Sequence, residues 1–185
     1  MMKNLIACCL VVLVACASID AAEQPSGDTQ DFYLLLSGLL NVNQDEYVFI
    51  DSSGKTAVDE LKMFKALEQI YITNIEPDLN DNSFSVERLK LVMFFAFYAE
   101  QRNASAFQEY LAADLMPIYL GNKNTFVKIL KELPFLTAAN CARLNAYFGH
   151  EGMNEDKKPD FIKTNKALFQ QTLESTQYSQ CMTFF

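Results

Sequence analysis

One segment of the sequence has part of the pattern of a phosphate-binding loop. Residues 47–56 read YVFIDSSGKT, so an apolar run is followed by a glycine, a lysine and a threonine. The full loop needs a glycine at position 49, where backbone amides wrap the phosphates, and this chain has Phe49 there. We therefore interpret the segment as an extended linker and a helix-capping loop, and we expect no nucleotide site.

A second segment places side-chain oxygens at alternate positions, as a calcium loop does, through Asp78, Asn80 and Asn82. The sixth position of such a loop is a glycine that permits a sharp turn, and the twelfth is a glutamate that binds through both oxygens. Here these positions hold Ser83 and Leu89. A turn followed by a helix cap is therefore the better interpretation.

Few other residues offer catalytic chemistry. The only histidine, His150, has no second histidine and no cysteine beside it at a metal-ligand spacing, so we interpret it as solvent-exposed. The sequence contains neither G-x-S-x-G nor H-E-x-x-H, and nothing singles out a pair among its 23 Asp and Glu residues. We expect a protein that is not an enzyme and that uses neither a metal nor a cofactor.

The N-terminus has the layout of a secretory signal peptide. Lys3 precedes an unbroken apolar run from Leu5 to Val14, and residues 15–17 (Ala-Cys-Ala) fit the cleavage rule. The run is too short to span a bilayer, which takes about 20 apolar residues. We expect residues 1–17 to be removed, with cleavage as late as residue 22 as a variant and an uncleaved anchor as the alternative. The mature chain is then secreted and extracellular.

Signal cleavage would leave two of the five cysteines, Cys141 and Cys181, in an oxidising compartment. A disulfide between them is expected to hold the C-terminal tail, with Phe184 and Phe185, against a helix around Cys141. A bridge between two chains is the alternative.

The sequence has one N-glycosylation sequon, Asn103-Ala104-Ser105. It lies in a predicted turn between helices, so Asn103 is the expected glycan acceptor.

The composition limits the partners. The 185 residues carry 15 Lys and Arg against 23 Asp and Glu, a formal net charge of −8. A surface of this sign repels phosphate backbones and anionic lipids, so we expect no nucleic-acid binding and no binding to anionic membranes. No segment after the leader is apolar for long enough to span a bilayer, so we also expect no membrane insertion. The chain is expected to be a monomer.

Apolar residues recur at helical spacing through most of the chain. This pattern predicts an all-α fold, a compact bundle of about seven helices around an aromatic-rich central helix, with one disulfide. We expect residues 18–30 to form a flexible leader and residues 31–185 to form a single all-helical domain. A capping box of Ser105 and Gln108 is expected, with a break at Gly121. The first predicted helix follows a cap at Asp28 and reaches residue 40, and the helix that starts at Ser105 ends by Gly121 after a bend or stop at Pro117. The other predicted helices are 56–73, 86–102, 126–133, 137–148 and 160–173.

The central helix contains Phe94, Phe95, Phe97 and Tyr98, and phenylalanine accounts for 15 residues of the chain. We interpret these rings as a close-packed core, because aromatic side chains dominate core burial. A cavity for a hydrophobic ligand is the alternative.

The leader MMKNLIACCLVVLVACAS, the acidic helical body and the single cysteine pair resemble the small secreted salivary proteins of blood-feeding insects, mosquitoes especially. The resemblance implies non-enzymatic binding of a host protein that alters immunity or haemostasis. Residues 94–111 (FFAFYAEQRNASAFQEYL) also resemble the helical N-terminal region of insect haemocyanin-like storage proteins, although the copper-binding portion is absent. An extracellular carrier of a small hydrophobic ligand and an insect reproductive or haemolymph structural protein are the alternatives.

Overall fold

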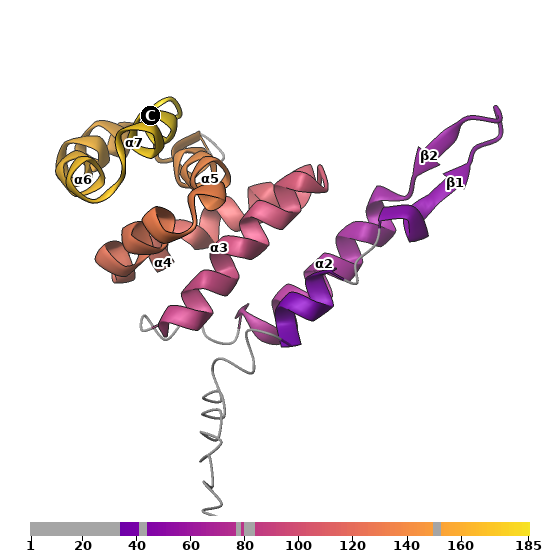
Figure 1. Cartoon of the computed structure of the whole chain (residues 1–185). Helices are drawn as coiled ribbons and strands as arrows, with labels where there is room; N and C mark the ends of the chain where they lie inside the picture. Colours follow the sequence, from indigo (N-terminus) through magenta and orange to yellow (C-terminus); the bar gives the residue numbers. More distant parts are fainter. Residues whose placement is uncertain (1–33, 41–43, 77–78, 80–83, 150–152) are drawn as a thin grey trace, which may run out of the picture.

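A computed structural model describes residues 34–40, 44–76, 79, 84–149 and 153–185 (Figure 1). The predicted signal peptide (1–17), the leader (18–30), most of the calcium-like segment and His150 lie outside these residues.

Seven α-helices account for most of the described residues, which confirms the all-α prediction. Among these residues no helix is both long enough and apolar enough to cross a membrane. The first helix covers residues 34–40; the others are α2 (Glu60–Asn74), α3 (Val86–Gln101), α4 (Ser105–Glu132), α5 (Thr137–Gly149), α6 (Lys158–Thr172) and α7 (Ser175–Met182). Short 3-10 turns are η1 (Gln44–Tyr47), η3 (Pro134–Leu136) and η5 (Glu155–Lys157).

Helix α3 lies between α2 on one side and α4 and α5 on the other (Figure 1). It begins where the Ser85 hydroxyl accepts a hydrogen bond from the Arg88 amide at 3.2 Å. Because its neighbours cover it on several sides, it is apolar around most of its circumference. The Phe95 ring lies 4.7 Å from Phe107 of α4 and 5.6 Å from Tyr71 of α2, so aromatic packing joins three helices. This cluster confirms the predicted aromatic core.

A small β-hairpin replaces the predicted linker and capping loop. Strand β1 (Val48–Ile50) pairs antiparallel with β2 (Thr56–Val58), with Phe49 opposite Ala57. The Asp51 carboxylate accepts hydrogen bonds from the Ser53 and Lys55 amides at 2.8 and 3.0 Å, and Gly54 has φ of +78°. The loop-like sequence is therefore a hairpin turn. Helix α2 starts only at Glu60, so the prediction of a helix from residue 56 was wrong.

Helix α4 joins two segments that were predicted as separate helices. Pro117 is accommodated inside it, and the break falls at Asn122, whose φ of −133° and ψ of 26° are not helical. The predicted break at Gly121 is therefore correct to within one residue, but the chain resumes its helix at once. The predicted capping box was wrong: Ala104 is the N-cap, with no side-chain bond, and the Gln108 amide donates to the Ala99 carbonyl instead.

The C-terminal segment folds as a further helix, α7, where the sequence analysis placed an irregular tail. A capping box starts it, in which Glu174 and Gln177 bond each other's backbone amides. The Gln177 amide nitrogen also donates to the Leu130 carbonyl of α4 at 2.6 Å. Helix α7 is thus fixed at its N-terminal end by polar contacts, independently of Cys181 near its other end.

The partly buried carboxyl group of Asp114 on α4 is expected to make stability depend on pH. The Tyr71 hydroxyl donates to the Asp114 carboxylate at 2.6 Å. Burial raises the pKa of Asp114, the Tyr71 bond opposes this rise, and the Glu76 carboxylate adds to it. The folded-state pKa therefore lies above the unfolded one, so stability is greatest below the unfolded pKa and falls as the pH rises through the folded pKa.

Replacing Asp114 with Asn should remove this dependence, because the amide keeps an acceptor for Tyr71 and cannot ionise. Urea unfolding of both proteins over a pH series from acid to neutral measures it. The parent is expected to lose stability relative to Asp114→Asn as the pH rises through the acid range. A difference that stays constant over this series would contradict the assignment.

Candidate ligand-binding groove

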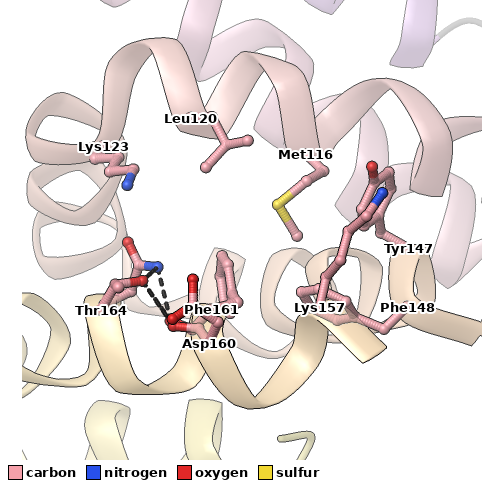
Figure 2. Close-up of a pocket in the computed structure, with 10 residues that line it drawn as sticks. Met116, Leu120, Lys123, Tyr147, Phe148, Lys157, Asp160, Phe161 and Thr164 are labelled. Atoms are coloured by element: carbon pink, nitrogen blue, oxygen red, sulfur yellow. Dashed lines mark hydrogen bonds between the residues drawn. The ribbon is translucent and has the colours of Figure 1, made fainter. Parts of the chain in front are cut away.

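An open groove of about 420 Å³ lies between α4 and α6, and the end of α5 and η5 close one side of it (Figure 2). Its wall on α4 spans residues 116–123, and its wall on α6 spans residues 160–165. None of its lining belongs to α3, and none of it belongs to the aromatic cluster of Tyr71, Phe95 and Phe107. The side chains that line it are Met116, Leu120, Lys123, Tyr147, Phe148, Lys157, Asp160, Phe161, Thr164 and Asn165.

The floor of the groove is apolar. Met116 and Leu120 are one turn apart on α4 and therefore share a face. Met116 is buried, whereas Leu120 stands at the rim and is 50% exposed. Opposite them, the Phe161 ring of α6 lies 5.2 Å from Phe148 and 5.3 Å from Phe185. Two neighbouring rings thus hold Phe161 in place without a ligand.

A buried polar contact beneath the groove fixes α4 against α6. The Tyr119 hydroxyl donates to the Asn165 side-chain oxygen at 2.9 Å, and the Asn165 amide donates to the Phe161 carbonyl at 2.7 Å. Burial raises the pKa of Tyr119 far above its ordinary value, so the phenol stays neutral and acts as a donor. Asn165 is 2% exposed and has its polar atoms satisfied by the protein. This contact sets the separation of the two walls.

Two lysines stand at opposite ends of the groove (Figure 2). The Lys157 ammonium donates to the Asn154 side-chain oxygen at 2.7 Å, and the Asn154 amide donates in turn to the Tyr147 carbonyl. Within the described ranges, Lys123 has no carboxylate within 4.0 Å. Asp160 is the one acidic residue in the lining, and it is exposed.

The groups that line the groove are apolar on its floor and polar at its edges. No three His, Cys, Asp or Glu side chains gather closely enough to hold a metal ion in the part of the chain that the structure covers. The lining offers an apolar floor, two cations, one carboxylate, two hydroxyls and an amide. It can therefore enclose an apolar chain and contact a polar head.

The predicted site residues lie elsewhere. Cys141 and Cys181 form the predicted disulfide, with 5.3 Å between their Cα atoms and both side chains fully buried. Asn103 is exposed in the turn between α3 and α4 and has φ of +54°, a conformation that asparagine tolerates better than most residues. An exposed turn suits a glycan acceptor, and its glycosylation stays a prediction. The groove is lined by neither of the two cysteines nor by Asn103.

Sequence reasoning missed the groove because its residues come from three separate segments. The helical spacing placed Phe148 and Leu120 in or beside helices, but it could not say which helix faces would meet. Asn165 carried a weak signal, since it is a polar residue on the otherwise apolar side of the helix that holds Phe161 and Phe169. A buried asparagine of this kind marks a place where two helices share a polar contact.

Comparison with family models, with curated proteins and with solved structures finds no match for this chain.

Proposed function

We propose that this chain is a secreted, non-enzymatic binding protein that carries a small hydrophobic ligand in the groove between α4 and α6. The observation that supports it is the groove itself, whose volume of about 420 Å³ and apolar floor match pockets for small molecules. Its walls are held by packed rings and by the contact between Tyr119 and Asn165. Such a preformed site needs little reordering when it takes a ligand.

Secretion is part of the proposal. Its support is the signal-like leader together with the disulfide between Cys141 and Cys181, since such bonds persist in oxidising compartments. A glycan on Asn103 would agree with it. Sequencing the N-terminus of the protein recovered from the medium of insect cells tests secretion, and an unprocessed chain retained in the cells would contradict it.

A second candidate function is binding of a host protein by a salivary effector, as the resemblance in the sequence implies. The hairpin favours it, because β1 and β2 extend from the outer end of α2 away from the other helices (Figure 1). Its strand residues Phe49 and Ile50 are 48% and 74% exposed. Neighbouring apolar side chains that are exposed in this way are typical of a surface that binds another protein. A partner bound there would leave the groove empty, so a test of the groove separates the two candidates.

A single tryptophan in the groove tests the proposed function. The sequence has no Trp, so Leu120→Trp gives one emission signal at the rim. We expect saturable titration with an amphiphile such as laurate, lauryl alcohol or laurylamine to shift this emission to shorter wavelength, because the ligand displaces water from the ring. Fluorescence is recorded below the concentration at which each probe forms micelles.

Leu61→Trp is the matched control, since Leu61 is exposed on α2 and does not line the groove. Its emission should not change over the same titration. If none of the three probes produces a saturable shift at Leu120→Trp, the groove is not a ligand site and the proposed function is wrong.

A further inference from the structure

We propose that the ligand of this groove is a single-chain amphiphile with one negative headgroup, a carboxylate, which Lys123 binds. This inference rests on the proposed function and adds the chemical class and the orientation of the ligand. The alkyl chain lies along the floor formed by Met116, Leu120 and Phe161, and the carboxylate lies at the Lys123 end (Figure 2).

Lys123 is the cation of the groove that is available to an anion. It follows the kink at Asn122, and Figure 2 shows its side chain directed into the groove opposite Thr164. It is half-buried, and among the described residues it has no carboxylate within 4.0 Å. A carboxylate there would gain a charge-assisted hydrogen bond, and such bonds are about twice as strong as neutral ones.

Lys157 is already engaged. Its ammonium donates to Asn154 at 2.7 Å, and Asn154 is itself 9% exposed and bonded to the Tyr147 carbonyl. A headgroup at this end would share the Lys157 ammonium with Asn154. Lys157 is also exposed, so water weakens its attraction for an anion more than it does at the half-buried Lys123.

The local charge agrees with an anionic head. The lining contains Lys123, Lys157 and Asp160, whereas the chain as a whole carries a net charge of −8. Two cations against one carboxylate leave the lining with a small excess of positive charge, which favours an anion over a cation. Asp160 is exposed, so water screens its repulsion of a carboxylate.

Calorimetric titration of the secreted protein with laurate, lauryl alcohol and laurylamine tests the inference, because these probes share one alkyl chain and differ in the charge of the head. We expect laurate to bind most tightly. Lys123→Met, which keeps the aliphatic stem, should lower the affinity for laurate about tenfold and leave the affinity for lauryl alcohol unchanged. Lys123→Arg should restore the affinity for laurate.

Lys157→Met is the matched control and should alter laurate affinity by less than about threefold. Asp160→Asn should raise the affinity for laurate by roughly threefold, because it removes the one negative charge of the lining. Far-ultraviolet circular dichroism and thermal unfolding show whether each variant keeps the parent fold.

The possible failures have different meanings. The inference fails if laurate and lauryl alcohol bind with equal affinity. It also fails if Lys157→Met lowers the affinity for laurate and Lys123→Met does not. Either result leaves the proposed function standing. A preference for laurylamine would overturn it in the same way and point to Asp160. If none of the probes binds, the inference and the proposed function both fail.

Discussion

Replacing Cys181 with Ser is expected to lower the free energy of unfolding by about 4 kcal/mol. The disulfide joins Cys141 of α5 to Cys181 of α7 across 40 residues of sequence, and a cross-link of this span removes much conformational freedom from the unfolded chain. Both sulfur atoms are fully buried, so the variant also leaves a free thiol and a hydroxyl in the interior. Urea unfolding without reductant measures the difference.

The matched control is Ser179→Ala, because Ser179 is exposed on the same helix. It should change stability by less than about 0.5 kcal/mol. The double variant of Cys141 and Cys181 to Ser should resemble the single variant to within about 1 kcal/mol, because either change breaks the same bond. A loss below about 1 kcal/mol in Cys181→Ser would show that the remaining contacts of α7 suffice.

Loss of the disulfide should also lower the affinity of the groove for its ligand. Beyond α7, the Phe185 ring lies 5.3 Å from the Phe161 ring, which forms part of the groove floor. If α7 detaches from α5, Phe161 loses the packing behind it. Cys181→Ser should therefore lower the affinity for laurate more than Ser179→Ala does, even under conditions where the variant remains folded.

Replacing Phe107 with Ala is expected to cost about 3–5 kcal/mol, comparable to loss of the disulfide. The Phe107 ring is fully buried and lies 4.7 Å from Phe95, 5.5 Å from Tyr71 and 6.0 Å from Phe64, so it contacts both α2 and α3. Its removal leaves a cavity that these rings fill only in part. Thermal and urea unfolding measure the change.

Phe49→Ala is the matched control, since Phe49 is 48% exposed on the hairpin. The same truncation there should cost less than about 1 kcal/mol. Equal effects at the two positions would contradict the view that the aromatic cluster holds α2, α3 and α4 together.

The sequence predicted the helices well where a single amphipathic period ran uninterrupted. Helix α3 begins one residue after Ser85 and ends at Gln101, close to the predicted bounds, because its cap and its apolar content both act locally. Helix α5 ends at Gly149, one residue past the predicted end at residue 148. The disulfide was predictable for a different reason: after removal of the leader, Cys141 had one intramolecular partner.

The errors arose where tertiary contacts override local signals. Pro117 lies inside α4, where packing against neighbouring helices offsets the disruption that a proline causes in a helix. Gln108 was assigned to a capping box but bonds a carbonyl of α3. The hairpin was missed because its strands have three residues each, too few to show an alternating pattern, although the Asp51-Ser-Ser-Gly54 turn was a usable signal.

The groove was beyond sequence reasoning for a further reason. Lys123 points into it because α4 bends at Asn122, and no residue pattern fixes the direction of such a bend. Phe161, part of its floor, packs against Phe148 of α5 and against Phe185, which follows α7. Both facts depend on how distant segments meet.

The most direct test of the groove as a ligand site is to map laurate onto the folded protein by NMR chemical-shift changes in the amide and methyl signals. We predict saturable changes at residues 116–123 of α4 and 160–165 of α6, the two walls of the groove, and none in the hairpin. Changes confined to residues 48–58, or no saturable change anywhere, would contradict it.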